Sequence, residues 1–147
     1  MPNAPSPVER RRVDPVTEIP AAESREAAQH FERLLSYETD CWDVHVALTA
    51  GHGSFVLLDV RTPAAFAAGH VPGAVNLPVR LISEERVAGY ARETLIVVYC
   101  NGPHCNGADK AALELSGLGR PVKVMMGGMT GWADEGFPFE ISQEVEA

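Results

Sequence analysis

Four short runs of aliphatic residues follow one another along the middle and end of the chain, and polar residues do not alternate strictly within any of them. Such runs are typical of strands that are buried on both faces of a sheet. The runs lie at residues 54–60, 73–77, 94–100 and 121–126. Residues 37–40, Tyr-Glu-Thr-Asp, predict a further short strand at an edge of the sheet.

The segments between these strands have the composition of helices. Helices are expected at residues 63–70, 83–91 and 107–119. Gly117 and Gly119 mark the end of the last one, and Asp40 or Thr39 is placed to cap a further helix over Trp-Asp-Val-His-Val-Ala-Leu-Thr-Ala-Gly. Strands that alternate with helices indicate a parallel sheet with right-handed crossovers and helices on both faces. The expected fold class is therefore α/β.

The N-terminal segment differs from the rest of the chain. Residues 1–20 carry four of the eleven prolines before Glu18 and show no hydrophobic periodicity, which predicts a disordered tail. At residues 21–36, apolar side chains recur at helical spacing and predict a helix that packs on the domain. Its apolar stripe is formed by Ala27, Phe31, Leu34 and Leu35. The domain itself is expected over residues 37–143, without an internal repeat or a second domain.

The composition fits one globular domain and bears on its partners. At 147 residues and 46% hydrophobic content, the chain is long enough to bury a core. Its 12 basic and 20 acidic side chains give a net charge of −8, which disfavours nucleic acids and anionic membrane surfaces, because both are polyanions. No apolar run approaches the roughly 20 residues that span a bilayer. No apolar segment follows the N-terminal charges, as it would in a secretory signal.

Three cysteines, Cys41, Cys100 and Cys105, are an odd number and too few for a disulfide scaffold. We therefore expect a cytoplasmic protein whose thiols stay reduced and matter through their reactivity. Cys41 has no glycine or basic neighbour and is interpreted as structural. A zinc site with Cys100, His104 and Cys105 would need a fourth ligand, and no Cys-x2-Cys or paired-histidine spacing supplies one. Neither a metal nor an organic cofactor is expected.

Distinctive residues follow three of the expected strands. Asp59 and Arg61 lie at the end of the first, Cys100 ends the third, and Gly127 and Gly128 follow the fourth. In open parallel sheets, ligands bind beyond the carboxyl ends of the strands. These residues therefore predict a functional site at that edge of the sheet.

The segment after Cys100 has the composition of a tight loop before a helix. Glycine and asparagine allow the positive φ angles of such a loop, whose successive N–H groups then form an anion-binding nest. The helix expected to begin near Asn106 adds the positive end of its dipole, whereas Pro103 removes one N–H donor. This loop would stabilise a thiolate or persulfide anion at Cys100, so we expect the pKa of the thiol to fall. The loop residues are Asn101, Gly102, Pro103, His104, Cys105 and Asn106.

Two further segments resemble the signatures of rhodanese-like sulfurtransferase domains. Residues 57–78 resemble the first signature, an Asp-x-Arg strand end followed by Gly-His-x-Pro-Gly-Ala-x-Asn. Residues 124–138 resemble the closing signature, Gly-Gly-x-x-x-Trp-x-x-x-Gly-x-Pro. The cysteine loop lies between them, and the resemblance extends over about residues 37–140. It implies a five-stranded parallel sheet between helices, with Cys100 carrying sulfur as a persulfide.

The resemblance gives each matching residue a role, and each role has a structural alternative. Asp59 and Arg61 are expected to brace the catalytic loop through charge-assisted hydrogen bonds. His70 is interpreted as a hydrogen-bonded turn residue, with a proton shuttle as the alternative. Trp132 is interpreted as core packing, with a substrate platform as the alternative. The glycine pair after the fourth strand is expected to form a tight turn that lets the backbone approach the pocket.

Two positions depart from the family pattern. Many relatives have an arginine where this chain has Cys105, and that arginine helps to hold anionic donors such as thiosulfate. Related phosphatases and arsenate reductases need a cysteine, five residues and then an arginine that binds the oxyanion bidentately, but Asn106 stands there. The phosphatase hypothesis therefore fails. Cys105 is either a small residue that fills the loop or a second redox thiol that resolves a persulfide on Cys100.

These observations predict a sulfurtransferase that moves sulfane sulfur from a small donor to a thiol or other nucleophilic acceptor, a protein acceptor included, through a Cys100 persulfide. The alternative is a non-catalytic module that binds a persulfide or a partner for sensing or regulation. The intact cysteine favours the enzyme, whereas the absent loop arginine and the N-terminal extension keep the alternative open. The missing arginine and the charge of −8 also predict that thiosulfate is a poorer donor than a persulfide of a small thiol.

Overall fold

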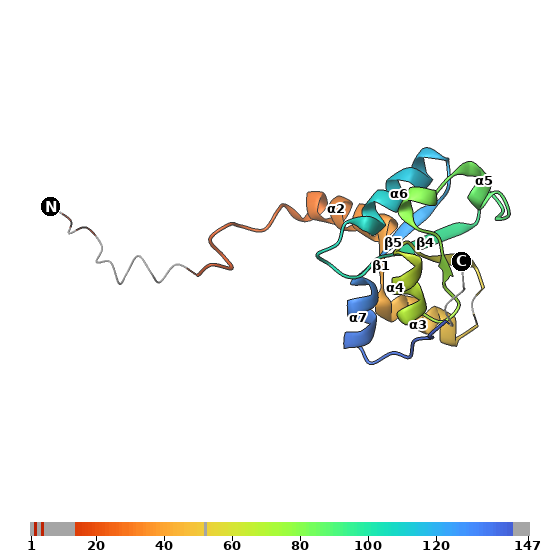
Figure 1. The fold of residues 1–147 in the computed structure, drawn as a ribbon. Coiled ribbons are helices and arrows are strands. Elements are labelled where there is room, and N and C mark those ends of the chain that lie inside the picture. Colours follow the sequence, from red (N-terminus) through yellow and green to blue (C-terminus); the bar gives the residue numbers. More distant parts are fainter. Residues whose placement is uncertain (1, 3, 5–13, 52, 143–147) are drawn as a thin grey trace. The chain divides into compact units, whose positions relative to one another are not determined.

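The computed structural model describes residues 2, 4, 14–51 and 53–142 (Figure 1). The chain divides into two compact units, residues 1–33 and 34–147. In the first unit, the N–H group of Thr17 donates a hydrogen bond to the carbonyl of Asp14 at 3.1 Å and forms a turn. Most of the tail predicted at residues 1–20 lies outside the described residues, so its disorder stays a prediction.

The helix predicted at residues 21–36 is present as α2 (Ser24–Tyr37). Its packing on the domain stays a prediction. Across the described ranges, 14–51 and 53–142 included, no helix has both the length and the apolar character needed to cross a membrane.

Among the described residues, five strands form one sheet in which all neighbouring strands are parallel. The strands are β1 (Glu38–Asp40), β2 (Phe55–Asp59), β3 (Val75–Asn76), β4 (Leu95–Tyr99) and β5 (Val122–Met126). Their order across the sheet is β1-β5-β4-β2-β3, so β4 lies in the centre. The parallel α/β fold and the edge strand predicted at residues 37–40 are confirmed.

The central strand β4 separates two hydrophobic clusters. Ile96, Val98 and then Cys100 belong to one cluster and Tyr99 to the other, since successive side chains of a strand point to opposite faces. The first cluster includes side chains of α5 (Glu84–Val87) and α6 (Gly107–Gly117), and the second includes side chains of α3 (Cys41–Thr49) and α7 (Gly128–Asp134). Figure 1 shows α5 and α6 on one side of the sheet and α3 and α7 on the other. Helices therefore cover both faces, as predicted.

Three of the described helices begin at side-chain caps that the sequence contains, and Ser83 caps α5 through its hydroxyl. Oδ1 of Asp40 accepts a hydrogen bond from the N–H of Asp43 at 2.8 Å and starts α3. Thr62 caps α4 (Pro63–Ala68) in the same way. Such caps satisfy N–H groups that have no partner within the helix. Of the two residues proposed to cap α3, the structure selects Asp40 over Thr39.

Three elements differ from the prediction. The helix predicted at residues 83–91 ends after one turn as α5, and the carbonyls at and beyond its end bind the buried guanidinium of Arg120. This guanidinium donates to the carbonyls of Val87, Tyr90 and Ala91. The short 3₁₀ helix η1 (Val79–Leu81) and helix α7 were not expected. Residues 127–131, Gly-Gly-Met-Thr-Gly, include the start of α7 but did not predict a helix, because glycine is a poor helix former.

Candidate active site

Cys100 follows the central strand directly, and its side chain belongs to the cluster that α6 covers. The residue is only 8% exposed. The loop after it turns sharply, because the N–H of Cys105 donates to the carbonyl of Gly102 at 3.1 Å. Helix α6 then begins at Gly107. The predicted arrangement of a cysteine at the end of a buried strand, a tight loop and a helix is confirmed.

The turn between β5 and α7 holds the cysteine loop in place. Its two glycines, Gly127 and Gly128, have φ angles of +94° and +57°, a region that residues other than glycine rarely adopt. A Cβ atom on Gly128 would overlap the carbonyl oxygen of Cys100 and lie 2.9 Å from the carbonyl carbon of Asn101. Without that atom, α7 approaches closely enough to bind the loop. The N–H groups of Met129 and Thr130 donate to the carbonyls of Cys100 and Asn101 at 3.0 and 2.7 Å.

Two thiols meet inside the loop. The sulfur atoms of Cys100 and Cys105 are 2.7 Å apart, so either thiol can donate a hydrogen bond to the other. Gly107 lies beside both, since a Cβ atom there would be 2.8 Å from Sγ of Cys100 and 3.5 Å from Sγ of Cys105. The N–H of Asn101 acts on both thiols and the N–H of Gly107 acts on Cys105, each lowering the pKa of the thiol. The backbone therefore supplies donors to the thiol pair, as predicted. The expected positive φ angles of the loop are wrong, because neither Gly102 nor Gly107 has one, nor does any described loop residue between Asn101 and Asn106.

The hydrogen bond between the thiols separates their pKa values. Burial raises the pKa of Cys100 to about 11, and the hydrogen bond with Cys105 acts in the same direction, while the N–H of Asn101 opposes it. The hydrogen bond from Cys100 lowers the pKa of Cys105, and the N–H of Gly107 adds to this effect. The expected fall in the pKa of Cys100 is therefore wrong, because burial and the second thiol outweigh the backbone donors. The directions of the two shifts favour Cys105 over Cys100 as the site of the thiolate.

Both thiols line a pocket of about 240 Å³. Its walls come from the cysteine loop, the first turn of α6 and the end of β5 with the glycine pair. Glu38 of β1 and Asp109 of α6 bring two carboxylates to it. Among the residues that the structure describes, neither a lysine nor an arginine lines this pocket. Its charge is therefore unfavourable for a dianionic ligand.

A buried ion pair joins the cysteine loop to the neighbouring strand. Asp59 has no exposed surface, and its carboxylate accepts hydrogen bonds from Nε and Nη2 of Arg61 at 3.0 and 2.7 Å. Nη2 also donates to the carbonyl of Gly69 at 2.6 Å, and Nη1 donates to Oδ1 of Asn101 at 3.3 Å. The ion pair thus links β2, the end of α4 and the loop. This geometry supports the bracing role expected of both residues.

His70 and Trp132 make structural contacts. Nδ1 of His70 donates to the carbonyl of Phe66 at 2.8 Å, and the two rings stack with centroids 3.7 Å apart. The backbone of His70 also pairs with that of Glu140. Trp132 is 1% exposed, and its Nε1 donates to the carbonyl of Pro138 at 2.8 Å. Neither residue is among the described ones that line the thiol pocket, which favours the structural interpretation of both.

The remaining loop residues differ in their relation to the pocket. Gly102 and Pro103 line it, whereas the side chains of His104 and Asn106 are exposed. The side chain of Asn106 makes no capping hydrogen bond to α6. Over the described ranges, no three His, Cys, Asp or Glu side chains are grouped so that they could hold a metal ion.

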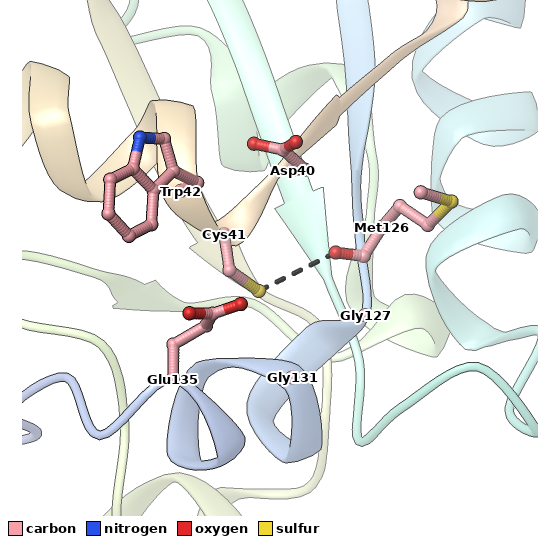
Figure 2. A pocket seen from close by; sticks show the side chains of 7 residues that line it. All are labelled: Asp40, Cys41, Trp42, Met126, Gly127, Gly131 and Glu135. Carbon is pink, nitrogen blue, oxygen red and sulfur yellow. Dashed lines mark hydrogen bonds between the residues drawn. The ribbon is translucent and has the colours of Figure 1, made fainter.

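The third cysteine lies on the other face of the sheet, in a separate cavity of about 200 Å³ (Figure 2). Sγ of Cys41 donates to the carbonyls of Met126 and Gly128 at 3.5 and 3.4 Å. Burial raises the pKa of Cys41 to about 11, and the carboxylates of Asp40 and Glu135 act in the same direction. Cys41 is therefore a weak nucleophile that packs beneath the glycine turn, which supports its structural interpretation.

Gly107, Thr130, Glu38 and Asp109 are among the residues of the site that were not singled out from the sequence. Gly107 belongs to the second Asn-Gly pair of the loop, and Thr130 is a polar residue within the closing signature, so each had a local signal. Glu38 had none, because β1 reaches the pocket only through its pairing with β5, where Glu38 lies opposite Val124.

Comparison with known proteins identifies relatives of this chain. The model of the Rhodanese-like domain family matches residues 44–135. A sulfurtransferase from Allochromatium vinosum is 36% identical over 83 residues, which are 56% of this chain and 76% of that protein. The thiosulfate sulfurtransferase GlpE from Pseudomonas putida is 37% identical over 90 residues, which are 60% of this chain and 77% of that protein. An HTH-type transcriptional regulator from Mycobacterium tuberculosis is 36% identical over 88 residues, 60% of this chain but only 38% of the regulator.

Solved structures share the fold. The crystal structure of a Bacillus halodurans protein superposes with a TM-score of 0.79 at 36% identity, covering 81% of this chain and 87% of that one. The solution structure of a rhodanese-like domain from Anabaena sp. gives a TM-score of 0.64 at 26% identity, covering 71% of this chain and 78% of that one.

Proposed function

Because this chain belongs to the rhodanese-like domain family, we propose that it is a sulfurtransferase in which Cys100 carries the transferred sulfur as a persulfide. The observation that carries this proposal is the position of Cys100 at the carboxyl end of the central strand, in the wall of a pocket and with a backbone N–H at its sulfur. The relatives named sulfurtransferases support the same class of reaction.

Loading of the sulfur uses both thiols. The Cys105 thiolate accepts the proton of Cys100 across the 2.7 Å contact as Cys100 attacks the sulfane sulfur of the donor. A bond forms between Sγ of Cys100 and this sulfur, and the bond from the sulfur to the rest of the donor breaks. The donor remainder leaves with the electron pair. Because the pKa of Cys100 is raised to about 11, this proton transfer supplies the nucleophile that the thiol alone would not.

Unloading returns the site to its first state. The thiolate of an acceptor attacks the outer sulfur of the persulfide, and Cys100 leaves as a thiolate that the N–H of Asn101 stabilises. Cys100 then takes back the proton that Cys105 accepted during loading, across the 2.7 Å contact. Donor and acceptor thus react in turn, which predicts ping-pong kinetics. Both steps require reduced thiols, and this requirement agrees with the proposed cytoplasmic location.

The charges of the pocket affect which sulfur donor it can bind. Glu38 and Asp109 line it, and no described lysine or arginine does. Lys110 helps to lower the pKa of Cys105, but it is not one of the lining residues. We therefore propose a persulfide of a small thiol as the donor and a small-molecule or protein thiol as the acceptor. Thiosulfate, a dianion, should be a poor donor.

Steady-state transfer to a small thiol, together with intact mass after rapid quenching, tests this function. The wild-type protein should become one sulfur atom heavier, whereas Cys100→Ser should not, although serine is nearly isosteric and should leave the unfolding midpoint unchanged. Cys41→Ser is the matched control, because Cys41 lies in the separate cavity and should not affect transfer. Transfer by Cys100→Ser at the wild-type rate would refute the proposal. Loss of folding in Cys100→Ser would show that Cys100 is a structural residue.

One observation favours a second function. A segment similar to this chain makes up 38% of a protein named as a transcriptional regulator. In a regulatory module, the persulfide would be a signal that the chain holds and not an intermediate. The number of turnovers separates the two functions, since a catalyst consumes many donor molecules per chain whereas a sensing module takes up one and retains it.

A further inference from the structure

The cysteine loop holds a second thiol close enough to react with the first. Sγ of Cys105 lies 2.7 Å from Sγ of Cys100, and a disulfide bond is about 2.05 Å long, so a small side-chain movement would join the two sulfurs. Cys100 is buried and Cys105 only half-buried, and both line the same pocket. A nucleophile is therefore placed beside the sulfur atom that would carry the persulfide.

We propose that Cys105 resolves the Cys100 persulfide, so that the protein reduces sulfane sulfur and releases it as hydrosulfide. Cys105 passes the proton that it accepted during loading to the ionised outer sulfur of the persulfide, and the resulting thiolate attacks the inner sulfur, which is Sγ of Cys100. A bond forms between the two Sγ atoms, and the bond between Sγ of Cys100 and the outer sulfur breaks. The outer sulfur leaves with the electron pair as hydrosulfide. The sulfane sulfur is thereby reduced, and the two cysteines are oxidised to a disulfide, which an external dithiol then reduces.

The backbone around the pair suits this step. Gly107 has no side chain that would separate the sulfurs, since its Cβ would lie 2.8 Å from Sγ of Cys100. The pKa of Cys105 is lowered first by the hydrogen bond from the Cys100 thiol, which a persulfide no longer donates, and then by the N–H groups of Gly107 and Asn101, which remain and increase the thiolate fraction. Hydrosulfide can leave into the pocket of about 240 Å³. Because attacking and attacked atoms belong to one loop, the step does not wait for a second molecule.

Resolution by Cys105 differs from sulfur transfer in the atom that is attacked. An external acceptor attacks the outer sulfur and carries it away, whereas Cys105 attacks the inner sulfur, and no acceptor gains sulfur. Cys105 therefore directs the sulfane sulfur to release as hydrosulfide whenever no acceptor thiol occupies the pocket. The inference rests on the proposed function, because it begins from a persulfide on Cys100.

A single-turnover experiment follows the fate of one sulfur atom. Wild type, Cys105→Ala and Cys41→Ala are loaded under nitrogen with a persulfide of a small thiol, freed of donor by gel filtration and quenched with iodoacetamide at increasing times. Trypsin cleaves after lysine and arginine, so both loop cysteines fall on the peptide Glu93–Lys110 and Cys41 falls on another. Mass spectrometry of this peptide and a hydrosulfide assay then report the products.

In wild type and in Cys41→Ala, the peptide Glu93–Lys110 should become two hydrogen atoms lighter and resist alkylation, with one hydrosulfide released per chain. Cys105→Ala should load more slowly, because it lacks the thiolate that accepts the proton of Cys100. Once loaded, it should retain the persulfide at least about tenfold longer, because only an external thiol can then remove it. Cys105→Ser should behave like Cys105→Ala, and it replaces that variant if the alanine variant unfolds.

Equal persulfide lifetimes in wild type and Cys105→Ala, with no disulfide on Glu93–Lys110, would overturn the inference and leave the proposed function intact. Failure of all these proteins to take up sulfur would overturn both. The two failures are therefore distinguishable.

Discussion

Gly128 tests how the fold positions the cysteine loop. The substitution Gly128→Ala adds one methyl group where the loop backbone already lies. Its Cβ would overlap the carbonyl oxygen of Cys100 and lie 2.9 Å from both the carbonyl carbon of Asn101 and the amide nitrogen of Gly102. These are backbone atoms, which cannot rotate away as the end of a flexible side chain can. The first turn of α7 and the loop must therefore separate.

The expected loss of stability has two parts. Alanine at a φ angle of +57° costs about 1–2 kcal/mol relative to an ordinary helical conformation. Separation of α7 from the loop weakens the hydrogen bonds from Met129 to Cys100 and from Thr130 to Asn101, each with a net contribution of about 1 kcal/mol. The free energy of unfolding should therefore fall by about 3–4 kcal/mol.

Gly73→Ala is the matched control, because Gly73 has a φ angle of +82° and open space where its Cβ would stand. It carries only the backbone cost of about 1–2 kcal/mol. In urea unfolding followed by circular dichroism, the midpoint should fall by about 1.5–2 M for Gly128→Ala and by less than about 1 M for Gly73→Ala. Sulfur loading at Cys100 should drop only in Gly128→Ala. Equal midpoints and unaltered loading in the two variants would refute the positioning role of the glycine turn.

Three further experiments probe the thiol pair and its pocket. Gly107→Ala places a Cβ 2.8 Å from Sγ of Cys100, so intact mass should show reduced sulfur loading, whereas Gly117→Ala on the same helix meets nothing within 4 Å and should load normally. Iodoacetamide should alkylate Cys105 first, at a rate that rises with pH through a pKa below the ordinary value of a thiol, and Cys100 only as the pH approaches about 11. Tandem mass spectrometry of the loop peptide separates the two sites. Earlier alkylation of Cys100 would contradict the assignment. Glu38→Gln removes a negative charge from the pocket. It should raise kcat/KM for thiosulfate at low salt and leave kcat/KM for a small persulfide nearly unchanged. An equal change for both donors would exclude an effect of charge.

Local patterns in the sequence were sufficient for the architecture and for the place of the site. The aliphatic run that ends at Cys100 became the central strand, and the glycines and asparagines after it became a tight loop before α6. Asp40 became the cap of α3. Strand periodicity, helix caps and turn residues act between neighbours in the chain, so a single sequence contains them.

The chemistry of the site depended on the tertiary structure. The sequence predicted a lowered pKa for Cys100, but burial and the sulfur of Cys105 at 2.7 Å raise it and favour Cys105 as the site of the thiolate. Glu38 reaches the pocket only because β1 pairs with β5, and Gly128 is required because α7 packs against the carbonyl of Cys100. A pKa or a steric limit is set by burial and by distances between atoms that the fold brings together. These quantities arise only when segments far apart in the sequence pack side by side.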